Sequence, residues 1–270
     1  MMKRRHFLSF SAWMILAFSV VACSAGQANQ SEVNYDTKLY DTKLTVSVAA
    51  SVQDAMQEIK TAYQAKNPDV AITYNFGSSG SLAQQIHQGA PVDVFLSASP
   101  KWMDDLEEKG QILTETRQNL LENSLVLIVA RNKEEVRGFK ELKTETVSYV
   151  AMGEPESVPA GQYAQEVLMS LGLFPSLESK LVFGKDVRQV LAYVETGNVD
   201  AGLVYGTDAQ ISESVKVVAT AASDTHAPIR YPVAVVRESL SPGVAQEFIN
   251  FLSTEAAIAI FEDYGFSIIN

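Results

Sequence analysis

The sequence has very few of the side chains that cross-link a fold or hold a metal ion. It contains one cysteine, Cys23, and three histidines among 270 residues. A single cysteine excludes a disulfide within the chain, and the paired Cys and His residues of structural zinc sites are absent. His87 and His226, the two histidines beyond the N-terminal segment, lie far apart in sequence, and we expect both at the surface. The composition therefore excludes a disulfide-rich or zinc-stabilised protein.

Basic residues are also scarce. Lys and Arg number 21 against 32 Asp and Glu, so the formal net charge is −11. Nucleic acid and anionic lipid surfaces are poor partners for so acidic a chain. An anionic ligand would be repelled by the overall field, and its capture would require oriented donors acting at short range.

A long apolar run stands at the N-terminus. Residues 1–5 are basic, residues 7–21 are largely apolar, and the run ends in Val-Val-Ala-Cys at 20–23. This pattern is too short for a stable membrane span and predicts a signal peptide over residues 1–22. Its end resembles a bacterial lipobox, which predicts that Cys23 becomes the lipid-modified first residue; the alternative is an ordinary secretory signal. Arg4-Arg5 and the residues after them also resemble a twin-arginine export motif.

Removal of this segment takes away three basic residues and no acids, so the balance becomes 18 − 32 = −14. The residues that follow, 23–42, are polar and contain Tyr-Asp-Thr-Lys-Leu twice in succession. We interpret them as a flexible tether. The chain is thus predicted to be exported and held by a lipid at the outer face of the cell membrane or in the periplasm.

From residue 44 onward, strand-like and helix-like segments alternate. Such alternation favours an α/β fold with parallel sheets covered on both faces, whose ligands bind at the carboxyl ends of strands. Ser51, with Asp54 three residues later, is predicted to cap one helix, and Ser99-Pro100 to open another. The expected strands cover residues 44–49, 70–76, 92–96, 124–130, 146–151, 181–183, 201–205, 215–219 and 231–236, and the last two helices 243–252 and 255–264.

Four of the strand-to-helix junctions carry small or hydroxyl-bearing residues. They are centred on Ser51, Ser79, Ala160 and Val187. The first N–H groups of a helix lack internal partners and carry the positive end of the helix dipole, so several such ends directed at one point bind an anion. The sequence therefore predicts an oxyanion-binding protein.

Each of these residues also has a structural interpretation. Ser51 and Ser79 can serve as helix caps alone, and Ala160 and Val187 offer no functional side chain. Gly77 and Gly80 fit a tight turn or a close backbone approach. Arg188 could reach an anion, although an arginine at this place in a helix is more often solvated.

A serine hydrolase is the alternative from another class. It would use Ser79 or Ser51 with a histidine and an aspartate. The residues Gly77-Ser78-Ser79-Gly80 miss the spacing of the nucleophile elbow by one position. His87 follows Ser79 by two helical turns, which is too far for a general base.

Ten segments in order resemble the molybdate-binding proteins of ABC transporters, from about Leu44 to Phe266. The segments are Ala49–Ser51, Phe76–Leu82, Gly89–Phe95, Lys101–Asp104, Asn123–Val126, Gly153–Gly161, Asp186–Arg188, Val204–Ala209, Tyr231–Val236 and Tyr264–Phe266. The resemblance implies a two-lobed type II periplasmic binding protein fold with two hinge crossings and a ligand cleft between the lobes. Residues 43–123 and 231–270 would form lobe 1, and residues 124–230 lobe 2.

The resemblance also implies the ligand and its donors. Ser51 and Ser79 would each give a hydroxyl and a backbone N–H, Ala160 and Val187 backbone N–H groups, and Tyr205 its phenol. The ligand would be molybdate or tungstate, with molybdenum held only as the bound oxyanion, and the partner an ABC membrane permease. The family implies a monomer without catalytic residues or cofactor. Sulfate is the alternative ligand, whereas protonated phosphate is disfavoured because the inferred site has no acid to accept its proton.

Overall fold

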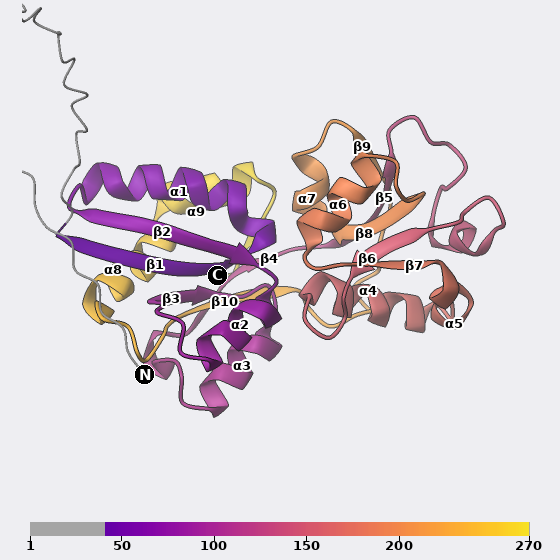
Figure 1. The fold of residues 1–270 in the computed structure, drawn as a ribbon. Helices are drawn as coiled ribbons and strands as arrows, with labels where there is room; N and C mark the ends of the chain where they lie inside the picture. The colour runs from indigo at the N-terminus through magenta and orange to yellow at the C-terminus, as the bar shows by residue number, and fades with distance from the viewer. Residues whose placement is uncertain (1–40, 270) are drawn as a thin grey trace, which may run out of the picture. The chain divides into compact units, whose positions relative to one another are not determined.

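A computed structural model of the protein describes residues 41–269. The predicted signal peptide, Cys23 and the tether up to residue 40 lie outside these residues. Two β-sheets, each flanked by helices, make up the described part of the chain (Figure 1).

The first sheet has six strands in the order β11-β4-β10-β3-β1-β2. β1 pairs in parallel with both β2 and β3, while β10 runs antiparallel to β3 and β4, and β11 antiparallel to β4. The strands are β1 (Thr42–Ala49), β2 (Val70–Gly77), β3 (Val94–Leu96), β4 (Gln118–Glu122), β10 (Arg230–Val235) and β11 (Ser267–Ile268).

The second sheet has five strands in the order β7-β6-β8-β5-β9. β6 pairs in parallel with β7 and β8, and β5 runs antiparallel to β8 and β9. The strands are β5 (Leu125–Ala130), β6 (Val150–Gly153), β7 (Leu181–Gly184), β8 (Ala201–Tyr205) and β9 (Val215–Thr220).

The expectation of purely parallel sheets is therefore wrong, because each sheet is mixed. The antiparallel strands flank the two places where the chain passes from one sheet to the other. β4 leads through residues 123–124 into β5, and β9 leads through residues 221–229 into β10. A strand that enters a sheet from the far side runs against those that the helical crossovers place in parallel.

Helices follow most of the strands. No single helix among residues 41–269 is long and apolar enough to cross a membrane. The consecutive helices α8 and α9, separated by residues 253–254, together have the length and composition for a span, but they bend by 61° at the break. The α-helices are α1 (Gln53–Lys66), α2 (Ser79–His87), α3 (Pro100–Glu108), α4 (Pro159–Ser170), α5 (Phe174–Leu177), α6 (Val187–Glu195), α7 (Gly206–Gln210), α8 (Pro242–Leu252) and α9 (Glu255–Asp263). The 3-10 helices are η1 (Ala50–Val52), η2 (Thr114–Thr116), η3 (Phe139–Lys143) and η4 (Glu178–Lys180).

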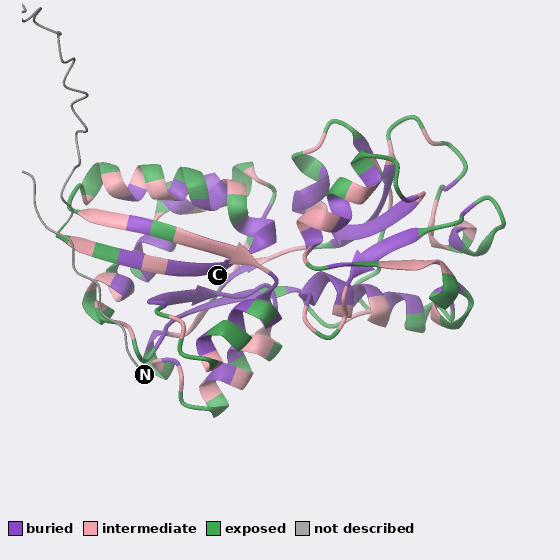
Figure 2. Ribbon diagram, in the orientation of Figure 1, coloured by how far each residue is buried: buried purple, intermediate pink, exposed green. Residues whose placement is uncertain are grey.

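The central strands of the first sheet are buried on both faces (Figure 2). In β3, Val94 and Leu96 belong to the large core that α1, α8 and α9 share, whereas Phe95 belongs to the smaller core beneath α2 and α3. Side chains alternate between the two faces of a strand, so consecutive apolar residues supply both cores. This burial fixes the carboxyl ends of β1, β2 and β3 at one edge of the sheet.

Candidate anion-binding site

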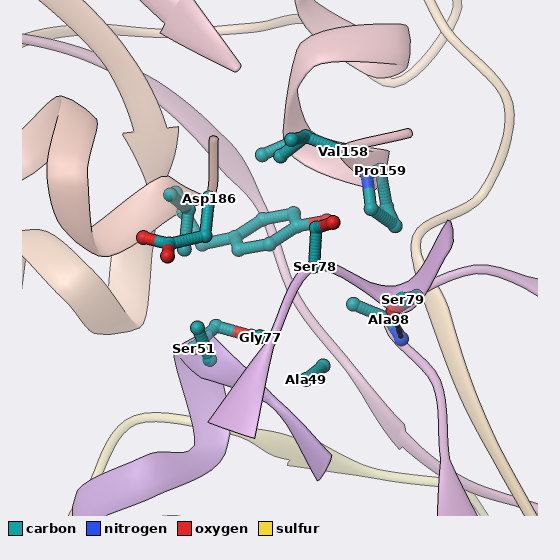
Figure 3. Close-up of a pocket in the computed structure, with 13 residues that line it drawn as sticks. Ala49, Ser51, Gly77, Ser78, Ser79, Ala98, Val158, Pro159 and Asp186 are labelled. Carbon is teal, nitrogen blue, oxygen red and sulfur yellow. Dashed lines mark hydrogen bonds between the residues drawn. The ribbon is translucent and has the colours of Figure 1, made fainter. Parts of the chain in front are cut away.

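One pocket lies where the carboxyl ends of strands from both sheets meet. All five residues that the sequence and the family resemblance proposed, Ser51, Ser79, Ala160, Val187 and Tyr205, line it, and each is buried (Figure 3). Its volume is about 10 Å³, which is close to the smallest volume that holds a single water molecule. The remaining lining residues are Ala49, Ala50, Gly77, Ser78, Ala98, Val158, Pro159 and Asp186.

Ser51 lies at the turn after β1, and its hydroxyl does not cap a helix. Residues 50–52 form the 3-10 helix η1, and α1 begins afterwards without a side-chain cap. The Ser51 Oγ instead lies 3.0 Å from the phenol oxygen of Tyr231. The predicted capping box of Ser51 and Asp54 is therefore wrong, because the 3-10 turn displaces the helix start by one residue, so that Val52 stands at the N-cap position.

Ser79 opens α2, but the residue before it is the cap. The Ser78 Oγ accepts from the backbone N–H of Ser81 and donates to the Ser81 hydroxyl, so it is used within the helix terminus. The Ser79 Oγ accepts from the backbone N–H of Ala98 at 2.9 Å. Because this bond fills a lone pair, the Ser79 hydroxyl hydrogen is left to donate into the pocket.

The start of α4 is held against the end of β6 by two glycines. A Cβ on Gly161 would lie 2.0 Å from the Gly153 carbonyl oxygen, so only glycine permits this approach. Pro159 stands at the first position of α4, and Ala160 follows. A backbone N–H at the second position has no acceptor within its own helix, so that of Ala160 is available at the pocket.

Val187 opens α6, and Asp186 caps it. The Asp186 Oδ1 accepts from the Gln189 backbone N–H at 2.9 Å. An acid thus lines the pocket, which corrects the expectation that none is present. In Figure 3 its carboxylate is turned away from Ser78 and Ser79. The carboxylate of this acid caps the start of α6, and Val187 lines the pocket.

Tyr205 ends β8 and supplies the one aromatic side chain of the pocket. It is 1% exposed, and its hydroxyl has no hydrogen-bond partner among residues 41–269. Burial raises the pKa of Tyr205 well above its ordinary value, with the neighbouring Tyr231 acting in the same direction. The phenol therefore stays protonated, and an unpaired buried O–H group is costly unless a ligand accepts from it.

Behind Ser51 lie two residues whose place in the site cannot be read from the sequence. Tyr231 is fully buried, and its hydroxyl oxygen accepts from the Asn123 Nδ2 at 3.1 Å. The same Nδ2 donates to the Thr207 hydroxyl at 2.9 Å. Ser51 and Tyr231 are 180 residues apart, and no periodicity or motif links side chains at that separation.

Arg188 is not solvated, contrary to the sequence-based expectation. Its guanidinium lies 2.7 Å from Asp54, 2.8 Å from Asp208 and 3.2 Å from the backbone carbonyl of Ser51. Burial raises the pKa of the fully buried Asp208 to about 7, although the guanidinium and the Tyr205 N–H lower it. Arg188 therefore joins α6 of the second sheet to α1 and the Ser51 turn of the first.

A second contact between the two halves involves Gly80. Its backbone N–H donates to the Ser157 carbonyl at 3.0 Å. A Cβ at this position would lie 2.6 Å from both the Ser157 oxygen and the Trp102 ring. The close approach that Gly80 allows is thus to backbone of the other half.

Of the histidines among residues 41–269, neither His87 nor His226 lines the pocket. His87 is half-buried rather than at the surface; its ring contacts Gln111 and Asp105, and Lys109 at 3.0 Å. His226 is also half-buried, edge-on to Tyr163. Among residues 41–269, neither Ser51 nor Ser79 has a histidine partner, and no cluster of three His, Cys, Asp or Glu residues could hold a metal ion. The geometry does not assemble the machinery of the hydrolase alternative.

The fold and the pocket define a protein that binds a small solute between two α/β halves. Residues 44–267 match the family of bacterial extracellular solute-binding proteins, and the chain belongs to this family. The two-sheet α/β fold predicted from the motifs is confirmed.

Two curated relatives each match more than four fifths of the chain. A putative ABC transporter substrate-binding lipoprotein of Bacillus subtilis is 44% identical over 255 residues, 94% of this chain and 95% of the relative. The molybdate-binding protein ModA of Haemophilus influenzae is 42% identical over 230 residues, 83% of this chain and 90% of the relative.

A solved structure agrees with these relatives. The substrate-binding domain of a putative molybdenum ABC transporter from Clostridium difficile is 44% identical, with a TM-score of 0.66, covering 85% of this chain and 100% of that one. The resemblance to molybdate-binding proteins that the motifs predicted is confirmed.

Proposed function

We propose that this protein captures molybdate outside the cytoplasmic membrane and delivers it to an ABC importer. The observation that carries the proposal is a small pocket lined by buried residues of four strand-to-helix junctions and by Tyr205, whose hydroxyl is unpaired among residues 41–269. A dianion leaving water needs several donors to replace its hydration shell, and neutral donors hold it without irreversible trapping. Molybdate-binding relatives of similar length support the choice of ligand.

The donors we assign are five residues. Ser51 and Ser79 give hydroxyl and backbone N–H groups, Ala160 and Val187 give backbone N–H groups, and Tyr205 gives its phenol. The unpaired Tyr205 hydroxyl supports this assignment, because it is a buried donor without a protein acceptor in the described chain. Tungstate has nearly the same size and charge, so the site is expected to accept it as well.

A thermal-shift screen of oxyanions tests the ligand. A ligand that binds only the folded state raises the melting temperature. On protein lacking residues 1–23, molybdate and tungstate should raise it, while sulfate and phosphate at the same concentration should raise it far less. Equal or greater stabilisation by sulfate would replace molybdate with sulfate as the proposed ligand, and hydrolysis of activated esters would reopen the enzyme alternative.

We further propose that the two sheets mark two lobes that close on the ligand. Lobe 1 comprises residues 43–123 and 231–270, lobe 2 comprises residues 124–230, and the passages between sheets are the hinge. The donors are divided between the lobes, so the ligand gains all of them only in the closed form. Trp102, beside the Gly80–Ser157 contact, should change its fluorescence on addition of molybdate, and the radius of gyration should fall. Identical scattering with and without molybdate would contradict closure.

The finer localisation is also a proposal. We assign residues 1–22 to a signal peptide and Cys23 to lipid attachment, so that a monomer is tethered beside its permease. A B. subtilis relative described as a lipoprotein supports this assignment. Mass spectrometry of the exported protein should find an acylated N-terminal Cys23, and Cys23→Ser should move the protein from the membrane fraction to the soluble one. An unmodified Cys23 would leave an ordinary secretory signal.

A further inference from the structure

The direction of the hydrogen bonds behind Ser51 can be deduced from the residues that surround it. The backbone N–H of Ser124 can only donate, and it donates to the Asn123 Oδ1 at 2.9 Å. The other end of the amide is therefore Nδ2, whose two hydrogens go to Thr207 at 2.9 Å and to the Tyr231 oxygen at 3.1 Å. All the donors of Asn123 are used, and its orientation is fixed.

The Tyr231 hydroxyl has two partners among residues 41–269, the Asn123 amide and the Ser51 hydroxyl. Its oxygen accepts from Asn123, so its single hydrogen has only the Ser51 Oγ to bond, at 3.0 Å. The opposite arrangement, in which Ser51 donates to Tyr231, would leave a fully buried phenol hydrogen unbonded, which is costly. Tyr231 therefore donates, and Ser51 accepts.

This direction leaves the Ser51 hydroxyl hydrogen free to face the pocket. The Ser79 hydroxyl is in the same condition, because the Ala98 N–H donates to its oxygen. Both serines thus have an acceptor position filled by a buried donor of the protein, and both present a hydrogen to the ligand. A pocket of this polarity favours an oxyanion without protons and disfavours one that must donate an O–H group.

From this geometry we infer that Asn123 and Tyr231 are positioning residues that fix Ser51 as a hydrogen-bond donor and so set the preference for fully deprotonated oxyanions. Neither residue lines the pocket. Asn123 lies at the passage from β4 to β5 and Tyr231 near the start of β10, so the hydrogen bonds that orient Ser51 come from the segments where the chain passes between sheets. The inference rests on the proposed function, since it names what makes that site selective.

A double-mutant cycle tests whether Tyr231 acts through Ser51. Calorimetric titration with molybdate is made on wild type, Ser51→Ala, Tyr231→Phe and the double variant. We expect Tyr231→Phe to weaken binding by roughly threefold to tenfold and to have no further effect in the Ser51→Ala background. Tyr63→Phe is the matched control, because Tyr63 is also buried but lies against Phe248 and Phe251, and its hydroxyl is unpaired among residues 41–269. The affinity of Tyr63→Phe for molybdate should equal that of wild type.

Selectivity gives a readout that a merely structural role would not move. In Tyr231→Phe the Ser51 oxygen can accept a hydrogen bond from the O–H group of hydrogen phosphate, so the ratio of the phosphate to the molybdate dissociation constant should fall by roughly threefold or more. Asn123→Ala is the second variant, for use if Tyr231→Phe does not fold. It removes the donor to the Tyr231 oxygen, which allows the Ser51 hydroxyl to donate to Tyr231 instead of to the ligand. The molybdate affinity and the ratio of dissociation constants should then change in the same direction as in Tyr231→Phe.

The outcomes separate the two claims. If wild type binds molybdate and the effects of Ser51→Ala and Tyr231→Phe add, or the phosphate ratio is unchanged, the orienting role is wrong while the proposed function stands. If wild type does not bind molybdate, the proposed function is wrong and the inference fails with it.

Discussion

In the site that we propose, the two halves of the pocket supply their donors in different ways. The first sheet contributes Ser51 and Ser79, whose hydroxyls can be removed by a single substitution. The second contributes backbone N–H groups of Ala160 and Val187, which no side-chain substitution removes, and one phenol, Tyr205. In the first half the donors depend on side-chain identity, and in the second they depend on where a helix begins. Substitutions in the two halves separate the dependence on side-chain identity from the dependence on the position of a helix start.

The largest effect should come from displacing a helix start in the second half. Gly161→Ala places a Cβ 2.0 Å from the Gly153 carbonyl oxygen, so the start of α4 must move and carry the Ala160 N–H with it. Overpacking of this kind costs about 1–3 kcal/mol of stability. The displaced Ala160 N–H also loses its hydrogen bond to the charged ligand, so molybdate affinity should fall on the order of a hundredfold.

The control for this prediction is a glycine at which an added Cβ meets no neighbouring atom. Gly243 lies near the start of α8, and a Cβ there would meet nothing within 4 Å. Gly243→Ala should keep the affinity and gain a few tenths to about 1 kcal/mol of stability. Wild-type affinity in Gly161→Ala would mean that α4 need not be held against β6.

Removing single hydroxyls in the first half comes next. Ser51→Ala and Ser79→Ala each lose one hydrogen bond to a charged ligand, worth about 1.5–3 kcal/mol, or roughly ten- to a hundredfold in affinity. The structure separates their effects on stability. Ser79→Ala leaves the buried Ala98 N–H unpaired, at a cost of about 1–3 kcal/mol in the ligand-free protein.

Ser51→Ala leaves the buried hydroxyl hydrogen of Tyr231 without an acceptor, which also destabilises the ligand-free protein. No helix cap is lost, because Ser51 does not cap α1. Chemical denaturation without ligand and calorimetry with molybdate measure the two effects separately. Unchanged affinity in both variants would exclude these serines as ligands.

Closing the two halves on each other should be sensitive to Gly80. In Gly80→Ala the Trp102 ring can turn aside, but the Ser157 backbone cannot, so closure is hindered at a cost of about 1–3 kcal/mol. Molybdate affinity should fall roughly five- to a hundredfold, with little change in the stability of the ligand-free protein. A matching loss of ligand-free stability would place the clash within one half rather than between the two.

The smallest effect on binding is expected from pH, because the donors do not titrate near neutrality. The Tyr205 phenol has its pKa raised by burial, so affinity should change by less than about tenfold between pH 6 and 8. Stability should respond more. The pKa of Asp208 is raised to about 7 by burial, so its contribution is present below its unfolded pKa and is lost as the pH rises from about 4 through about 7.

The difference in unfolding free energy between wild type and Asp208→Asn should therefore fall with pH across that interval, by on the order of a few kcal/mol. Asp200→Asn is the control of opposite sign. Partial burial opposes it, but the N–H groups of Tyr149 and Ser148 and the Lys133 ammonium hold the pKa of Asp200 below its usual range. Its contribution is present at neutral pH and is lost as the pH falls. Parallel pH profiles for the two variants would contradict the assignment.

The sequence by itself determined the order of the helices and strands and the junctions whose residues line the pocket. Strand-like runs were predicted in the right order because apolar residues buried on one or both faces leave a strong local pattern, as at residues 44–49 and 201–205. Four of the pocket-lining residues that we propose as donors were predicted from strand-to-helix junctions, since helix termini expose N–H groups wherever they occur. Tyr205 came only from the family resemblance, because a tyrosine that ends a strand has no local mark of a ligand. β4 and β11 were missed because strands of five and two residues carry little periodicity.

Only the tertiary structure decided how these pieces act together. Which serine caps α2 depended on whether Ser78 or Ser79 met the Ala98 N–H across the sheet. The ion pairs of Arg188 depended on two elements meeting, and its local sequence gave no sign of them. The same holds for Tyr231, whose bond to Ser51 joins residues 180 positions apart. Local patterns specify what each segment becomes, whereas hydrogen-bond direction and burial are set by neighbours that only the folded chain brings into contact.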